Sequence, residues 1–242
     1  AKLLYSIYVV LTFIQIACLL LAKMPLFDTL TLTFGTVGTG GFGVKNDSLG
    51  SYTTLQQSII TFFMIISGIN YSFYFLIISK KLKDAFCLEE VRWYLSIIFG
   101  AVILITLNIY HLYDGFGVSL KHAFFQVASI ITTTGYSSTD FNLWPEFSKT
   151  IMVILMIIGA CAGSTAGGFK ISRMMILLKS IKVELSQMIH PREIKKIRLD
   201  GHVVKPEVLR TAQVYLMLYW TIFLLSILLI SIDNFDFTTN FT

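Results

Sequence analysis

Two runs rich in threonine and glycine contain the residues whose types and spacing point most clearly to chemistry. The first reads Gly35-Thr36-Val37-Gly38-Thr39-Gly40-Gly41-Phe42-Gly43, and the second reads Ile130-Ile131-Thr132-Thr133-Thr134-Gly135-Tyr136-Ser137. They superpose at a single offset, which pairs Thr39 with Thr133, Gly41 with Gly135 and Phe42 with Tyr136. Asp47 and Asp140 follow at nearly matching positions. Such internal repetition predicts that the two runs have the same role.

Backbone carbonyls of an extended Thr-Gly run can replace the hydration shell of a cation. Glycine suits such a run, because a positive φ turns a carbonyl without a Cβ penalty. We therefore predict that backbone oxygens of both runs bind a cation, and that no ring of acidic side chains is needed. The predicted ion-binding residues are Val37, Gly38, Thr39, Gly40, Gly41, Ile131, Thr132, Thr133, Thr134 and Gly135.

A short apolar stretch precedes each run, at residues 26–34 and 120–129. We expect each stretch to be a half-helix that enters the membrane from outside, so that the negative end of its dipole favours a cation. Non-helical backbone is tolerated at membrane depth only where protein buries it or where it lines a wet cavity, and a re-entrant loop meets that condition. The alternative is a pair of ordinary glycine-rich turns. Two copies after matching half-helices favour pore loops.

The composition places these loops in a membrane. Of the 242 residues 55% are hydrophobic and 14% are charged, and the mean hydropathy is +0.73. About 20 apolar residues cross a bilayer as a helix. Five stretches without Asp, Glu, Lys or Arg qualify, namely residues 3–22, 55–79, 93–110, 150–169 and 212–232. We predict an all-α membrane protein built from repeated units of helix, re-entrant pore loop and helix.

The basic residues indicate the orientation. Lys and Arg are concentrated in residues 80–92 and 170–210, whereas acidic residues divide evenly between the two sides, with Glu90 on the first of these inner segments. The positive-inside rule makes this side cytoplasmic. The net charge of +5 and the pI near 9.0 then require no nucleic-acid partner. We interpret residues 179–210 as a solvated linker that faces anionic lipid.

A glycine-rich segment lies in the inner half of the fourth stretch. Residues 159–168 contain four glycines, three alanines and two hydroxyl side chains. Glycine costs about 1 kcal/mol per helical position relative to alanine, so we expect local unwinding. The alternative is close helix packing through Gly159-x-x-x-Gly163 and Gly163-x-x-x-Gly167.

Other chemistry fits poorly, and we predict that the chain is not an enzyme. The spacing of a phosphate-binding loop fails in residues 163–172, because Phe169 and Ile171 interrupt it. The best enzyme interpretation would be an intramembrane serine protease with Ser164 as its nucleophile. No base can activate Ser164, because all four histidines lie outside the spans. The three cysteines are too far apart in sequence for a metal or disulfide pattern. Asn70, the only amide in the second stretch, is expected to hydrogen-bond a neighbouring helix and is assigned no site.

At these motifs the sequence resembles the Trk/Ktr/HKT superfamily of potassium uptake proteins, especially bacterial Trk-type membrane subunits. Residues 36–42 are similar to that family's second filter segment. Residues 131–137, with Asp140, Phe141, Trp144 and Pro145, are similar to its third, and residues 159–170 resemble its glycine-rich helix break. The family has four repeats around one pseudo-fourfold pore. The resemblance covers the second and third repeats and the start of the fourth.

The resemblance implies a division of the chain. Residues 1–79 would be the second repeat, residues 80–92 a cytoplasmic loop and residues 93–178 the third repeat with its break. Residues 179–211 would be a basic cytoplasmic linker, and residues 212–242 the first helix and truncated pore region of the next repeat, whose pore segment would begin in residues 235–242.

The resemblance also implies a function. It predicts passive potassium uptake across the bacterial inner (plasma) membrane by a multi-pass homodimer with cytosolic nucleotide-binding regulatory subunits, which would contact residues 179–210. Potassium would bind at the filter residues, and no organic cofactor is expected. The predicted gate residues are Gly159, Gly163, Ser164, Thr165, Gly167, Gly168 and Lys170.

The sequence leaves open two alternatives to passive potassium uptake. In this family a filter glycine favours potassium, and a serine in one repeat accompanies sodium selectivity. Gly41 and Gly135 are both glycine, but the repeat that usually carries the serine is not in this sequence. A sodium-permeable or K/Na-coupled symporter of the same superfamily is therefore one alternative. A non-conducting membrane scaffold or regulatory subunit is the other.

Overall fold

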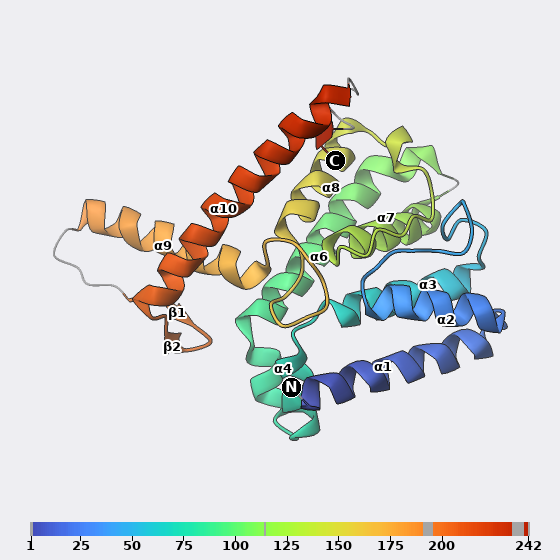
Figure 1. Ribbon diagram of the computed structural model, residues 1–242, viewed down its shortest axis with the longest axis horizontal. Helices are drawn as coiled ribbons and strands as arrows, with labels where there is room; N and C mark the ends of the chain where they lie inside the picture. Colours follow the sequence, from blue (N-terminus) through green and yellow to red (C-terminus); the bar gives the residue numbers. More distant parts are fainter. Residues whose placement is uncertain (1, 114, 191–195, 234–239, 242) are drawn as a thin grey trace. The chain divides into compact units, whose positions relative to one another are not determined.

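A computed structural model describes residues 2–113, 115–190, 196–233 and 240–241. The chain divides into two compact units, Ala1–Ile171 and Ser172–Thr242. Helices make up nearly all of the regular structure, as the sequence predicts. Figure 1 shows the helices in chain order.

The N-terminal repeat of the chain contains three helices that pack against one another. They are α1 (Lys2–Leu21), α2 (Leu26–Val37) and α3 (Thr54–Ser67). Pro25 precedes α2, where a missing backbone N–H costs nothing. Thr53 and Gln56 form a capping box that starts α3. The short α2 is the predicted half-helix, and it extends to Val37 instead of ending at residue 34.

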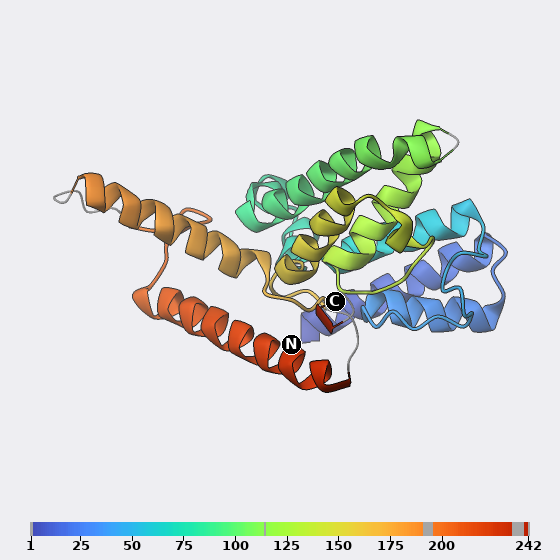
Figure 2. The same ribbon diagram turned by 90° about the horizontal axis from the view of Figure 1, so that it is seen from above.

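The next repeat along the chain has the same arrangement. It contains α6 (Glu89–Ile109), α7 (Phe116–Ile131) and α8 (Glu146–Ile158), each packed against the other two. The 3-10 turns η1 (Tyr110–Leu112) and η2 (Phe141–Leu143) connect them. Helix α7 is the second half-helix and extends two residues beyond the predicted end at residue 129. Contacts between α3 and α7 join the two repeats (Figure 2).

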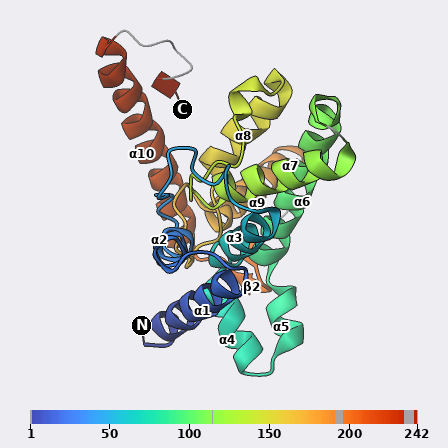
Figure 3. The ribbon, with the colours of Figure 1, turned by 90° about the vertical axis from the view of Figure 1, so that its right-hand side faces the viewer.

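The second predicted span is not one helix. It is broken into α3 and α4 (Tyr71–Ile78), which meet at an angle of 90°. Asn70 caps α4 by accepting a hydrogen bond from the Ser72 N–H at 2.9 Å, and Gly68 ends α3. Helix α5 (Leu82–Cys87) follows and packs on α4 and on α6 (Figure 3). The hydropathy of residues 55–79 shows only that the whole stretch is apolar, whereas the cap at Asn70 determines where the helix breaks.

The fourth predicted span is also interrupted. Helix α8 ends at Ile158, and residues 159–170 contain no helix. The prediction of unwinding is confirmed. The helix-packing alternative is wrong, because the glycine spacing is not displayed on a helix.

The second unit contains α9 (Ile171–Ile189), a two-residue antiparallel pair β1 (Arg198–Leu199) and β2 (His202–Val203), α10 (Pro206–Ile230) and the turn η3 (Ser231–Asp233). Among the described residues, 89–112 and 206–233 form two helices long and apolar enough to cross a membrane, and the bent α3–α4 pair makes a third candidate. The predicted pore segment at residues 235–242 lies almost wholly outside the described residues.

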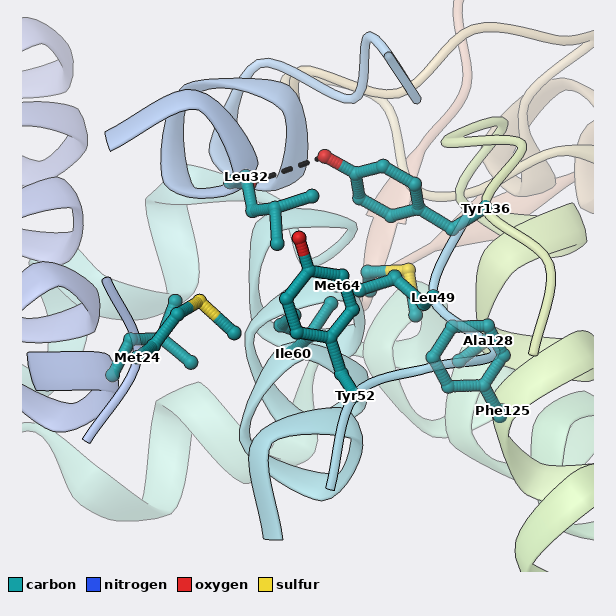
Figure 4. Packing of buried hydrophobic residues seen from close by; sticks show 10 residues of the cluster. Met24, Leu32, Leu49, Tyr52, Ile60, Met64, Phe125, Ala128 and Tyr136 are labelled. Carbon is teal, nitrogen blue, oxygen red and sulfur yellow. Dashed lines mark hydrogen bonds between the residues drawn. The ribbon is translucent and has the colours of Figure 1, made fainter. Parts of the chain in front are cut away.

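A buried cluster between the two repeats positions the Thr-Gly segments (Figure 4). Its residues are Leu19, Met24, Leu32, Leu49, Tyr52, Ile60, Met64, Phe125, Ala128 and Tyr136. They come from α1, α2, α3, α7, the turn between α1 and α2, and the loops that follow the half-helices. Both half-helices and the returning loops therefore share one packed interior, which restricts how far the two segments can move apart.

Candidate ion-conducting site

The two Thr-Gly segments have the same backbone conformation. Thr39 and Thr133 have φ values of 51° and 55°, and Gly41 and Gly135 have φ values of 70° and 86°. Positive φ is uncommon for threonine, so its occurrence at equivalent positions indicates that the surroundings impose the conformation.

Their hydrogen bonds also correspond. The N–H groups of Gly40 and Gly41 donate to the Gly35 carbonyl at 2.8 and 3.3 Å. In the other repeat the N–H groups of Thr134 and Gly135 donate to the Ser129 carbonyl at 2.9 and 3.3 Å. Every pair is separated by the same 94 residues, as in 129 − 35 and 135 − 41. The sequence repeat is therefore a structural repeat at the level of single bonds.

Gly41 and Gly135 lie side by side. A Cβ atom built on Gly41 would overlap the Thr134 carbonyl oxygen and would lie 3.4 Å from the Gly135 Cα. A Cβ built on Gly135 would meet open space instead. Gly41 therefore packs against the other segment, whereas Gly135 has open space beside its Cα.

The first residue of each predicted ion-binding run belongs to a helix. Val37 is the last residue of α2 and Ile131 is the last residue of α7, and both are fully buried. Gly38 and Thr132 are the caps at the ends of these helices. The non-helical backbone of each segment accordingly begins at these caps and runs to Gly41 and Gly135.

The second segment is anchored from both sides. The Tyr136 hydroxyl donates to the Leu32 carbonyl of the other half-helix at 3.2 Å, as drawn in Figure 4. The Ser129 hydroxyl donates to the Tyr136 carbonyl at 2.6 Å. Beyond the segment, the Leu49 N–H donates to the Ser137 carbonyl at 2.9 Å. The Ser129 bond braces the second loop internally, and the other two bonds tie the two pore loops directly to each other.

The loops on the outer side bring the two predicted acidic residues to one cavity. Asp47 and Asp140 both line it, with serines and asparagines of both loops. The Ser51 hydroxyl hydrogen-bonds the Asp47 carboxylate and lowers its pKa. Asp140 accepts a hydrogen bond from the Asn142 N–H at 3.0 Å. Both carboxylates stabilise turns of the loops.

The glycine-rich segment forms an irregular loop, residues 159–170, which we call the glycine loop. Gly159, Gly163 and Gly168 have positive φ values of 70°, 70° and 82°, and so does Lys170 at 79°. A Cβ on Gly159 would lie 2.6 Å from the Gly167 carbonyl oxygen, so the two ends of the loop approach too closely for a larger residue. The Lys170 ammonium donates back to the Ala166 carbonyl.

The glycine loop contacts both Thr-Gly segments. The Gly167 N–H donates to the Thr133 hydroxyl at 2.6 Å. The Thr39 hydroxyl donates to the Thr165 carbonyl at 3.1 Å. The loop therefore lies directly against both segments, just beyond the ends of the two half-helices.

The glycine loop also lies against the break between α3 and α4. The Cys161 N–H donates to the Gly68 carbonyl at 3.1 Å, and the Tyr71 N–H donates to the Gly163 carbonyl at 3.2 Å. Ser164, proposed and rejected above as a nucleophile, donates to the Cys161 carbonyl at 2.6 Å. Two interrupted helices thus satisfy each other's free backbone groups, as irregular backbone at membrane depth requires.

The predicted hydrogen bond from Asn70 to a neighbouring helix is confirmed, since its amide donates to Glu90 of α6. Two features of this junction were not predicted: Asn70 also adjoins the glycine loop, and Glu90 is buried instead of lying in a solvated inner loop. A glycine and an asparagine two residues apart in the middle of an apolar stretch were a signal for a break. Nothing in the sequence near Glu90 indicated its burial.

Two half-helices of this kind, each ending in a Thr-Gly segment inside a helical membrane fold, define a pore-loop membrane protein. The model of the family described as TrkH, cation transport protein, matches residues 1–241, and the chain belongs to this family. The resemblance found in the sequence is thereby confirmed, and with it a multi-pass place in the bacterial inner membrane. The family consists of cation transporters and not of enzymes.

The chain is also similar to curated proteins of the Trk system. The chain is 33% identical to the Trk system potassium uptake protein TrkH of Salmonella typhimurium over 98% of the chain and 50% of the relative. It is 31% identical to the Trk system potassium uptake protein TrkG of Escherichia coli over 100% of the chain and 50% of that relative. The chain spans about half the length of the curated relatives it matches.

A solved structure has the same fold. The crystal structure of the potassium transporter TrkH from Vibrio parahaemolyticus superposes with a TM-score of 0.93 at 28% identity, over 99% of this chain and 53% of that one. The fold prediction of repeated helix, pore loop and helix units is confirmed.

Proposed function

We propose that the protein to which these residues belong takes up potassium passively through a pore whose filter includes the two Thr-Gly segments. The adjacency of Gly41 and Gly135, in matching conformations at the ends of two half-helices, is the observation that carries the proposal. Carbonyl groups of residues 38–41 and 132–135 would replace the water around the ion. The names of the TrkH and TrkG relatives reported above, both potassium uptake proteins, support potassium as the ion.

We propose further that the glycine loop is the gate. It is irregular, it lies against both segments, and its hydrogen bonds run mostly to backbone groups that a shifted loop could exchange. A loop of glycine and alanine can move without dragging bulky side chains through the packed interior. Closure would place it across the inner mouth, and conduction would require it to move aside.

Growth of a potassium-uptake-deficient bacterium tests the filter. The full-length gene should restore growth at low potassium. The Gly135→Ser variant should lose that rescue or shift the permeability towards sodium, because its hydroxyl enters the open space beside the segment. Gly100→Ser is the matched control, since its Cβ also meets open space but lies on α6. Rescue unaffected by Gly135→Ser would refute the site assignment.

Single-channel recording tests the gate. Deletion of residues 162–167 from the full-length protein should raise the open probability while leaving the order of ion permeabilities unchanged. Unchanged conductance and gating would refute the proposal. A preference for sodium in the intact protein would favour the symporter alternative, and the absence of any current or flux would favour a non-conducting scaffold.

The segment of residues 179–210 is the expected contact surface for a partner protein. We propose a homodimer that binds a cytosolic nucleotide-binding subunit through residues 179–210, and the abundance of Lys and Arg in this segment supports an electrostatic contact. Charge reversal at the exposed Lys182 and Lys205 should weaken regulator binding in a pull-down from membranes. Light scattering of the purified protein should give the mass of two chains.

A further inference from the structure

A buried carboxylate sits where the glycine loop meets the broken span. Glu90 lies in the first turn of α6 and is only 7% exposed. Its Oε1 atom accepts a hydrogen bond from the Ala162 N–H at 2.6 Å, and its Oε2 atom accepts one from the Asn70 Nδ2 at 3.0 Å. A buried carboxylate is tolerated when donors occupy its oxygens, and charged acceptors form short, strong bonds. Each oxygen of Glu90 has such a donor.

Asn70 fixes the direction of this arrangement. Its Oδ1 atom accepts from the Ser72 N–H, so its Nδ2 group is the one that faces Glu90. On its other side Asn70 adjoins the loop, since a Cβ on Gly163 would lie 3.2 Å from Oδ1. Asn70 therefore connects three elements: the broken span, the start of α6 and the glycine loop.

The glycine loop offers few side chains by which it could be held. The polar groups of Ala162 and Gly163 are all in the backbone. The Glu90 carboxylate accepts a hydrogen bond from one of them, the Ala162 N–H. A hydrogen bond to a charged acceptor is worth more than the neutral backbone bonds that the loop makes elsewhere. The loop is therefore held at the Ala162 N–H by one strong hydrogen bond, which can break when the loop moves.

We propose that Glu90 and Asn70 form a latch that holds the glycine loop in its closed position, and that opening requires the Ala162 N–H to leave Glu90. This inference rests on the proposed gate and names the residues that position it. Both residues act through the loop, so they are positioning residues and need not touch the ion.

The test uses the full-length protein in planar bilayers, with open probability as the readout. Glu90→Ala should raise the open probability about tenfold or more, and Asn70→Ala should raise it less, because the Ala162 contact remains. Glu89→Gln is the matched control. Glu89 also lies in the first turn of α6, so loss of its charge changes the interaction with the helix dipole as loss of the Glu90 charge does. It should leave gating unchanged. The order of ion permeabilities should not change in any variant.

A second background separates a latch from a general loss of stability. In the protein lacking residues 162–167, Glu90→Ala should have no further effect on open probability, because the group it holds is gone. If deletion raises open probability while Glu90→Ala does not, the latch is refuted and the gate stands. If deletion itself changes nothing, the gate is refuted. An increase from Glu90→Ala that persists in the deleted background also refutes the latch.

Variants that keep the shape of the side chain cover the case in which Glu90→Ala does not assemble. Glu90→Gln retains an oxygen that can accept from Ala162 but loses the charge, so an intermediate increase in open probability is expected. Wild-type gating in a well-assembled Glu90→Gln protein would contradict a charge-dependent latch.

Discussion

Gly41 and Gly135 occupy equivalent places in their repeats but differ in the space around them. We predict that Gly41→Ala lowers the thermal stability of the full-length protein strongly, because the new Cβ would displace the Thr134 backbone carbonyl. Gly135→Ala should cost only the strain of positive φ, about 1–2 kcal/mol. Thermal unfolding in detergent, followed by size-exclusion profiles, measures the difference. Equal losses would contradict the asymmetric packing.

The residues that follow Gly41 and Gly135 also differ between the repeats. Tyr136 is 1% exposed and donates to Leu32, whereas Phe42 is 82% exposed. Tyr136→Phe should destabilise the protein by about 1 kcal/mol, because it removes a buried hydrogen bond between the two repeats, although the Thr36 hydroxyl still donates to the Leu32 carbonyl. Tyr110→Phe, at an exposed ring, should change little. A Tyr136→Phe protein as stable as its control would show that the hydroxyl does not tie the loops together.

The break in the second span is the informative feature among the elements. Gly68 fits against Tyr94: a Cβ there would overlap the Tyr94 hydroxyl and lie 2.9 Å from the Thr132 Cγ2. The same hydroxyl donates to the Ile65 carbonyl at 3.0 Å. This packing brings the end of α3 close to α6 and to the cap of the second half-helix.

This packing predicts coupling between two substitutions. Gly68→Ala should destabilise the protein and disturb gating, and Tyr94→Phe alone should cost about 1 kcal/mol through the lost hydrogen bond. The double variant should be more stable than the sum of the single effects, because removing the hydroxyl makes room for the methyl group. Thermal unfolding of the four proteins gives the coupling, and strict additivity would argue against this contact.

The orientation of the whole molecule follows from the basic residues and is open to chemical labelling. Cys87 is exposed in the predicted inner loop, and Cys161 is buried. A membrane-impermeant maleimide should label Cys87 in inside-out vesicles and not in spheroplasts. A cysteine placed by Asn142→Cys in the predicted outer loop should show the reverse. Labelling of Cys87 from outside would invert the topology.

The membrane class, the repeat, the half-helices and the interrupted fourth span could all be predicted from the sequence. These features depend on composition and on neighbouring residues: apolar length determines whether a helix can span, and glycine content determines where it is weak. The alignment of Thr39 with Thr133 already contained the equivalence that the φ values display. A family pattern extended the prediction to function, because the filter motifs are local.

Only the tertiary structure decided how these parts meet. The overlap that a Gly41 side chain would make with Thr134, the packing of Gly68 against Tyr94 and the burial of Glu90 against Ala162 all join residues far apart in sequence. Local propensity is the same whether a carboxylate at a helix start faces water or a backbone N–H. Which of these it faces is determined by the packing of other helices around it, and that packing places Glu90 beside the glycine loop.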